Sequence, residues 1–295
     1  MTAPRGEASE FEPYRSYLRG LAYRMLGSRA DAEDAVQDAW LRWSGADRAG
    51  VGNPRAFLAQ TVTRLCLDRL KSASAQRELY VGEWLPEPLL GDTAAFQPGP
   101  EAASELACDL SFAFMRALER LSPLERAAFL LHDVFDMDFA EIATALARSG
   151  AACRQLAARA RASIKKSRPR FKVSAEEGER LAAAFADAVR RGDAAALAGV
   201  LAKDATFISD GGGRVAAVPR PLVGRERVAK AVIGFARLYD PGQMSVRRAR
   251  INGLAGFVVS SADGRPIQTI AIEPDAQGKI AAIYVQRNPD KLINM

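Results

Sequence analysis

The sequence predicts two all-α modules followed by an α+β domain. Apolar residues recur at helical spacing before Pro169, except in a Pro- and Gly-rich stretch at 76–104. After Pro169, two helices precede a series of short β-type runs, the order typical of an α+β domain. The chain has 295 residues, 48% of them apolar, so it can bury more than one core. The expected divisions are 1–75, 76–104, 105–170 and 176–295.

The first module, residues 1–75, is expected to hold three helices. The segment FEPYRSYLRGLAYRML has apolar residues at helical spacing and is stopped by Gly27. A second helix opens at Ser28. A third starts with Asn53 as N-cap and Pro54 at the first helical position, the order that both residues favour.

Residues 76–104 are expected to form a flexible linker. They include LYVGEWLPEPLLGDTAAFQPGP, which has no periodicity. As a relaxed coil this length averages about 30 Å from end to end. Trp84 resembles an anchor, with stiffening from Pro86 and Pro88; a tryptophan that merely packs on a surface is the alternative.

The module at 105–170 has the spacing of a helix-turn-helix. FAEIATALA is followed by a three-residue break at 148–150 and then by AACRQLAARARASI. Five residues form the inward stripe of the second helix: Cys153, Leu156, Ala157, Ala160 and Ile164. Ser149 can cap this helix and leave its N-terminal amides facing a phosphate.

Charge is segregated along the chain rather than spread. The net charge is +6, yet residues 142–172 hold nine Lys or Arg and no Asp or Glu. A solvated basic helix end would explain the later cations. It does not explain Arg154, because a cation in a first helical turn is electrostatically unfavourable. The segment is therefore expected to bind DNA through Ser149, Arg154, Gln155, Arg159, Arg161 and Lys165.

An acidic face is expected on the helix that opens at Ser28. Asp34, Gln37 and Asp38 lie opposite Trp40 in DAEDAVQDAW. Acids in a first turn also suit the helix dipole, but Asp38 lies too far along the helix for that explanation. The face is a candidate docking surface for a basic partner.

The C-terminal domain, residues 176–295, is expected to be α+β with an antiparallel sheet. A helix capped by the Ser174-x-x-Glu177 box ends at Gly192. DGGGR then joins two β-type runs, ATFIS and RVAAV. Three glycines permit positive φ and close approach of another backbone. A hairpin loop without function is the alternative.

Several classes of site are not expected. No run of 18 apolar residues exists, which argues against a transmembrane helix. Three cysteines without a CxxC and a single histidine argue against a disulfide framework or zinc site, and fit a reducing cytoplasm. No metal, cofactor or catalytic residue is assigned; Asp204, Asp210 and Tyr239 are the candidates for facing a cavity.

Two groups of motifs resemble known families. DAEDAVQDAWLRW, NPRAFLAQTVTRLCLDRLKS and LSPLERAAFLLHDVFDMDFAEIATALARSGAACRQLAARAR resemble regions 2 and 4 of extracytoplasmic-function (ECF) sigma factors. WLPEP, DGGGR and NPDKL are similar to motifs of the SigJ-like group, which carries an extra SnoaL-like domain of the NTF2-type cone fold. Members usually have an Arg where this chain has Leu156, so no −35 sequence preference is inferred.

The resemblance implies an alternative sigma factor regulated in cis by its C-terminal domain. The partners would be promoter DNA and RNA polymerase core, at the β flap and at the β′ clamp helices, the latter against Asp34, Gln37 and Asp38. The implied −10 contacts are Asn53, Arg55, Phe57, Arg64, Arg69 and Lys71; core packing is the alternative for Phe57. The implied regulatory contacts are Trp84, Leu85, Pro86, Asp210, Gly211, Gly212, Gly213, Arg214, Asn288, Pro289 and Asp290.

Two other functions stay open from the residues alone. One is a ligand-sensing helix-turn-helix regulator that never binds polymerase. The other is a DNA-tethered SnoaL-type enzyme, which fold analogy alone does not establish. A small ligand in the C-terminal domain is compatible with each.

Overall fold

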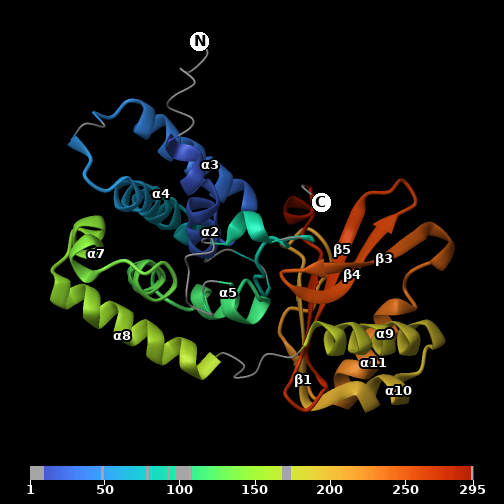
Figure 1. The fold of residues 1–295 in the computed structure, drawn as a ribbon. Helices are drawn as coiled ribbons and strands as arrows, with labels where there is room; N and C mark the ends of the chain where they lie inside the picture. The colour runs from blue at the N-terminus through green and yellow to red at the C-terminus, as the bar shows by residue number, and fades with distance from the viewer. Residues whose placement is uncertain are drawn as a thin grey trace. The chain divides into compact units, whose positions relative to one another are not determined.

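The computed structural model describes residues 10–47, 50–77, 80, 82–91, 93–97, 106, 108–167, 174–293 and 295. The chain folds into two compact units (Figure 1). The first unit comprises Met1–Glu78 and Thr93–Arg168, and the second comprises Leu79–Asp92 and Pro169–Met295. The linker is therefore divided: residues 79–92 belong to the unit that contains the C-terminal domain.

The first unit is helical. Its described helices are η1 (Glu12–Tyr14), α2 (Arg15–Leu26), α3 (Arg29–Ser44), α4 (Pro54–Arg77), η3 (Ala94–Phe96), α5 (Phe112–Glu119), α6 (Pro123–Phe129), the π-helical turn η4 (Leu130–Val134), α7 (Phe139–Leu146) and α8 (Gly150–Ser167). Figure 1 shows α4 beside α7, and α8 running along the α6–α7 region. Both all-α modules of the sequence analysis thus belong to one unit.

Local signals in the sequence set the helix ends. Ser28 accepts a hydrogen bond from the Asp31 amide at the start of α3. The Asn53 side chain accepts from the Ala56 amide at the start of α4. At the end of α2, Gly27 adopts a φ of 70°, which a residue without Cβ accommodates at low cost. These three predicted ends are confirmed.

The two helical modules share a core that includes polar contacts. Tyr17 of α2 packs edge-on against Phe135 of the second module, with ring centroids 4.9 Å apart. Arg126 of α6 is only 3% exposed. Its Nη1 donates to the Met25 carbonyl at 2.6 Å, and its Nη2 donates to Glu119 at 2.8 Å. A buried guanidinium therefore joins the end of α2 to the second module.

Residues 93–97 of the linker pack on α2. Arg24, fully buried, donates from Nη1 to the Phe96 carbonyl at 2.9 Å, and burial lowers the pKa of its guanidinium to about 10. Gly20 lets η3 approach, because a Cβ there would collide with the Phe96 carbonyl. The segment 93–97 is thus packed into the first unit.

The second unit contains a six-stranded sheet and three α-helices. The helices are α9 (Ala175–Arg191), α10 (Ala194–Val200) and α11 (Arg225–Ala236). The strands are β1 (Leu201–Asp210), β2 (Leu222–Val223), β3 (Met244–Ile251), β4 (Leu254–Ser261), β5 (Pro266–Pro274) and β6 (Ile280–Gln286), and the short turns are η5 (Pro241–Gln243) and η6 (Pro289–Lys291). Figure 1 shows α9, α10 and α11 packed together on the sheet.

The sheet differs from the expected antiparallel arrangement in one pairing. The strand order is β2-β1-β6-β5-β4-β3, and β1 pairs with β6 in parallel while the other pairs are antiparallel. The run RVAAV, expected as a strand, is irregular, and the partner of β1 on its other side is the short strand β2. The α+β class is confirmed, with this correction to the sheet.

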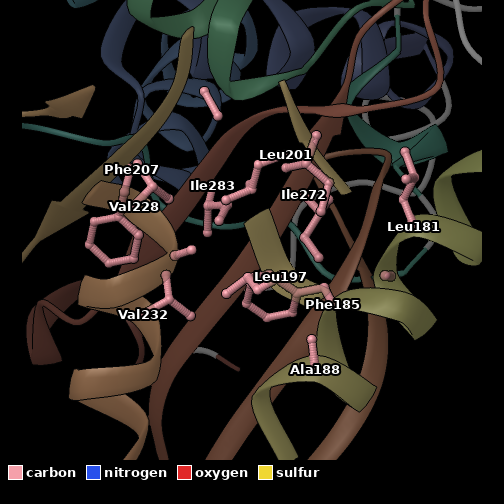
Figure 2. Close-up of a cluster of buried hydrophobic side chains, with 14 of the residues drawn as sticks. Leu181, Phe185, Ala188, Leu197, Leu201, Phe207, Val228, Val232, Ile272 and Ile283 are labelled. Carbon is pink, nitrogen blue, oxygen red and sulfur yellow. The ribbon is translucent and has the colours of Figure 1, made fainter. Parts of the chain in front are cut away.

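A cluster of buried apolar side chains packs between the helices and the sheet. Figure 2 shows Phe185 of α9, Leu197 of α10 and Val228 and Val232 of α11 directed toward Ile283 of β6. All five are buried. The three helices therefore cover one face of the sheet.

The described residues contain neither a helix long and apolar enough to cross a membrane nor a His/Cys/Asp/Glu group that could hold a metal ion. The three cysteines are unbridged. Burial raises the pKa of the Cys66 thiol to about 12, which keeps that thiol protonated and unreactive.

Candidate nucleic-acid interface and linker site

The basic helix α8 has the amphipathic character that the sequence predicts. All five residues of the inward stripe are buried, with exposures of 0–8%. Arg154, Gln155 and Lys165 lie on the exposed side. Ser149 accepts a hydrogen bond from the Ala152 amide at 3.2 Å and so caps the helix. The inward stripe and the cap are confirmed.

Two cations of α8 have acidic neighbours within the first unit. Arg159 pairs with Glu125 at 3.0 Å, and Arg161 pairs with Asp133 at 2.6 Å. Their side chains remain 65% and 43% exposed, so the pairs are screened by water and weak. Phosphate oxygens can replace the carboxylates at little cost. The acids also fix the two guanidinium groups along one side of the helix.

Three of the six residues assigned to −10 contact are bound to the helix-turn-helix module. Asn53 donates to Glu141 at 2.9 Å, and Arg55 donates to the Phe135 carbonyl at 3.2 Å. Arg64 donates to the Thr144 and Ala145 carbonyls at 2.9 and 3.1 Å. We call this set of hydrogen bonds the α4–α7 contact.

The α4–α7 contact has a clear electrostatic origin. Thr144 and Ala145 lie in the last turn of α7, where carbonyls lack helical partners and carry negative partial charge. The guanidinium of Arg64 satisfies two of them. The same cation is therefore suited both to this helix end and to a phosphate, and it cannot serve both at once.

The remaining −10 residues have different surroundings. Phe57 is half-buried against Trp43, with ring centroids 5.8 Å apart, which supports a packing role. Lys71 is exposed and pairs with Asp68 at 3.2 Å. Arg69 donates to Asp38 at 2.9 Å and so ties a residue assigned to DNA to one assigned to polymerase.

The acidic face of α3 is only partly available. Asp34 and Gln37 are exposed. The Asp38 side chain is 44% exposed, and one oxygen accepts from Arg69. A basic partner at this face would meet two polar side chains directly and would compete with Arg69 for the third.

A buried carboxylate in the second unit binds the linker. Asp210, the last residue of β1, is 0% exposed. The Tyr80 hydroxyl donates to its Oδ1 at 2.5 Å and the Leu85 amide donates to its Oδ2 at 2.9 Å. The Gly212 amide and the Gln286 side chain donate to the remaining lone pairs at 2.9 and 3.2 Å. Asp210 therefore connects the linker to the sheet.

Lys291 supplies the counter-charge. Its Nζ lies 2.7 Å from Asp210 Oδ2 and donates to the Leu85 carbonyl at 2.6 Å. The same ammonium lies 4.7 Å from the centre of the Trp84 ring and 5.1 Å from that of Tyr80, within cation–π range. We call Asp210, Gln286, Asn288 and Lys291, with the residues Tyr80, Leu85 and Pro86 that they bind, the linker site.

The second unit also holds the linker beyond the linker site. The Leu89 amide donates to Asn252 at 2.9 Å, and the Asn252 amide donates back to the Leu89 carbonyl at 2.8 Å. Leu90 forms a β-bridge with Ile251 at the end of β3. The described part of the linker is therefore bound to protein, which replaces the expected relaxed coil.

The buried anchor of this segment is Leu85, at 0% exposure, whereas Trp84 is half-buried. Pro86 is also buried, and Gln286 donates to its carbonyl at 3.3 Å. The prolines explain the absence of periodicity: they fix an extended backbone that binds through carbonyl groups.

The DGGGR loop has a structural reason for two of its glycines. A Cβ at Gly211 would collide with the Val215 carbonyl, and one at Gly212, where φ is +63°, would collide with the Asn288 side chain. Arg214 pairs with Asp290 at 3.1 Å on the surface. The loop and the NPDKL segment therefore pack together, although Asp210 and Lys291 are 81 positions apart in the chain. Gly213 and Pro289 are exposed.

Sequence reasoning missed four residues of this arrangement. Tyr80, Gln286 and Asn252 follow no motif that could have indicated them. Lys291 lies within NPDKL, which also contains Asn288 and Asp290, and membership of this motif is the one sequence signal that indicates a role for it. Its partner Asp210 is 81 residues away in sequence.

Two family models match the chain. Sigma-70 region 2 matches residues 11–76, and Sigma-70 region 4 matches residues 111–164. These ranges contain the acidic face of α3, the helix α4 and the helix-turn-helix of α7 and α8. The two models define the class: a sigma-70-type transcription initiation factor.

Similar proteins extend the match over the whole chain. The ECF RNA polymerase sigma factor SigJ of Mycobacterium tuberculosis is 39% identical over 298 residues, covering 97% of this chain and 93% of that protein. The probable ECF RNA polymerase sigma factor SigI of the same species is 35% identical over 196 residues, which cover 66% of this chain and 66% of that protein. The crystal structure of SigJ aligns with a TM-score of 0.76 and 35% identity, covering 98% of this chain and 99% of that one.

The chain belongs to the ECF sigma factors and is an alternative sigma factor, a transcription initiation factor of a non-enzymatic family. The likeness to SigJ includes the C-terminal domain, so the second unit is part of the shared architecture. A helix-turn-helix regulator that does not bind polymerase is not favoured, because the chain matches region 2 as well as region 4.

Proposed function

We propose that this sigma factor is restrained in cis by its C-terminal domain, which withholds the linker between regions 2 and 4. The domains in this proposal are region 2 at 1–75, the linker at 76–104, region 4 at 105–170 and the regulatory domain at 176–295. The observation that supports it best is the linker site, where Asp210 and Lys291 bind Tyr80 and Leu85.

In the active form, each face has its own partner. Asp34, Gln37 and Asp38 bind the β′ clamp helices of RNA polymerase, and region 4 also binds the β flap. The helix α8 binds the −35 element in the major groove through the residues assigned above. The N-terminal part of α4 and its cations bind the opened −10 strand, where stacking and backbone contacts offset the cost of unpairing.

The restraint follows from the length of linker that is left free to span regions 2 and 4. The −10 and −35 elements lie more than one helical turn apart, and one turn is about 34 Å. While 93–97 stays on α2, the nine steps from Gln97 to Leu106 span at most about 32 Å. The α4–α7 contact also covers Asn53, Arg55 and Arg64. Promoter engagement therefore requires α4 to separate from α7 and the linker to leave its binding sites and extend.

The test is transcription with purified core polymerase and a promoter library. Asp210→Asn keeps the side-chain shape but removes the anion that Lys291 and the linker amide share, so the linker is released more often and specific transcripts increase several-fold. The matched control is Asp204→Asn, an exposed aspartate of the same strand. Unchanged or reduced output from Asp210→Asn, with core binding intact, would refute the restraint.

A further inference from the structure

The second unit encloses a cavity of about 1180 Å³ that is separate from the linker site. It lies between the sheet and the helices α9 and α11. Its walls are mostly apolar and include Phe185, Phe207, Phe257, Ile270 and Val285. This volume is slightly above the usual range for small-molecule pockets, about 300–1,000 Å³. A molecule with a sizeable apolar body therefore fits.

One cation enters the apolar part of the cavity. Arg287, which follows β6, donates from Nη1 to the Ala216 carbonyl, and its guanidinium lies 5.9 Å from the centre of the Tyr239 ring. Its Nε is buried and has no hydrogen-bond partner among the described residues. A buried donor without an acceptor is costly, so a movement of the guanidinium that brings its Nε to a ligand oxygen is favoured.

The charge of the lining has one dominant sign. The charged lining residues are Arg190, Arg191, Arg237, Arg287 and one acid, Asp240. Arg190 and Arg191 share Asp187, an ion pair on the rim. The other polar groups in the wall are internally bonded: Tyr239 donates to Gln268 at 3.2 Å, and Ser209 accepts from the Val218 amide at 2.8 Å. An anion is thus favoured over a cation, and the planar guanidinium fork matches a carboxylate.

The same two strands face the cavity and the linker. Side chains alternate along a strand, so Ser209 and Val285 line the cavity while Asp210 and Gln286 bind the linker. The Arg287 amide donates to the Asp210 carbonyl at 2.7 Å, which ties the cavity cation to the linker carboxylate.

The irregular segment from Gly211 to Val218 connects the two sites physically. On the cavity side, Arg287 holds the Ala216 carbonyl, and Ser209 holds the Val218 amide. On the linker side, the Gly212 amide bonds to Asp210. A ligand oxygen that draws the guanidinium away from Ala216 removes one of the bonds that keep this segment in place.

We propose that the cavity binds an apolar carboxylic acid whose carboxylate pairs with Arg287, and that occupancy loosens the linker site. The binding step is independent of the proposed restraint. The consequence for transcription rests on it: a loosened linker site releases the linker, so the ligand acts as an inducer.

The binding step is tested by calorimetry on the full chain with dodecanoate and with dodecanol, which differ only in the head group. Dodecanoate binds the wild type and Arg265→Gln, an exposed hairpin control, at least about tenfold more tightly than it binds Arg287→Gln, the loss expected for a charge-assisted pair. Dodecanol binds all three alike, which also shows that the variant keeps its cavity. Failure of dodecanoate to bind the wild type, or equal dodecanoate affinity in Arg287→Gln, overturns the site.

The coupling step is tested by hydrogen exchange in the peptide 82–91, whose Leu85 and Leu89 amides are bonded in the second unit. Saturating dodecanoate accelerates exchange of this peptide in the wild type and leaves it unchanged in Arg287→Gln. Unchanged or slower exchange in the wild type overturns the coupling. These measurements need no polymerase, so their failure is distinct from failure of the Asp210→Asn transcription test.

Discussion

The α4–α7 contact in the first unit and the linker site in the second both bind segments that the proposed active form has to release, but they are built differently. Arg64 donates to backbone carbonyls at the surface. Asp210 is buried, has a counter-ion that is only 14% exposed, and accepts hydrogen bonds from linker, loop and sheet. Water and salt weaken the first kind of contact and hardly reach the second. The difference predicts an order of release. We expect DNA alone to displace the α4–α7 contact, whereas release of the linker site requires a specific trigger.

The largest expected effect comes from removing the counter-ion of the linker site. Lys291→Met leaves the buried Asp210 carboxylate without its ammonium, which costs about 3–5 kcal/mol in the free energy of unfolding of the second unit. Denaturant unfolding of the full chain measures this. Lys230→Met, an exposed lysine of α11, is the control and should change stability by about 0.5 kcal/mol or less. Equal values for the two variants would show that the pair is effectively solvated.

A smaller effect is expected from the hydroxyl of Tyr80. Tyr80→Phe removes the hydrogen bond that the hydroxyl donates to Asp210 and those that it accepts from Asn288 and Lys291, and should weaken linker binding by about 1 kcal/mol. Faster hydrogen exchange of the peptide 82–91 at neutral pH would report the loss.

The same hydroxyl gives the linker site a pH dependence. Burial, and then the bond to Asp210, raise the pKa of Tyr80 above its ordinary 10.0. The stabilisation is therefore complete below pH 10 and is lost as the pH rises through the higher folded pKa. The difference in tyrosinate absorbance between the wild type and Tyr80→Phe should appear only above pH 10. A difference that titrates at or below pH 10 would contradict the assigned bond.

The smallest effect is expected at the α4–α7 contact. Glu141→Ala removes the acceptor of Asn53, whereas Glu141→Gln keeps an acceptor and removes only the charge. A neutral exposed hydrogen bond is worth about 0.5 kcal/mol, so Glu141→Ala should bind a single-stranded −10 oligonucleotide about twofold more tightly than Glu141→Gln. Fluorescence anisotropy with full-length protein resolves this. Identical affinities would mean that the contact does not limit access to α4.

Local signals explain what the sequence could predict. Ser28, Asn53 and Gly27 mark helix ends because capping depends on nearest neighbours in the chain. The buried stripe of α8 follows from a period of 3.6 residues. Both kinds of information are contained in a short window of sequence.

Long-range pairing explains what it could not. The bond between Tyr80 and Asp210 joins residues 130 positions apart, and that between Arg64 and Thr144 spans 80 positions. Strand periodicity does not specify direction, so the parallel β1–β6 pair was not foreseen. The linker has no periodic pattern because it binds through backbone groups, among them the Leu85 and Pro86 carbonyls, and not through one face of a helix or strand. Cations assigned to DNA by their charge have protein partners that no single-sequence pattern reports.

Arg126 has a further consequence. Its guanidinium stays paired with Glu119 inside region 4 when the bond to the Met25 carbonyl is broken. Water can replace that single acceptor, so the bond across the two modules can break while Arg126 keeps its counter-ion. In the separation of regions 2 and 4 that we propose, this side chain therefore exposes no unpaired charge.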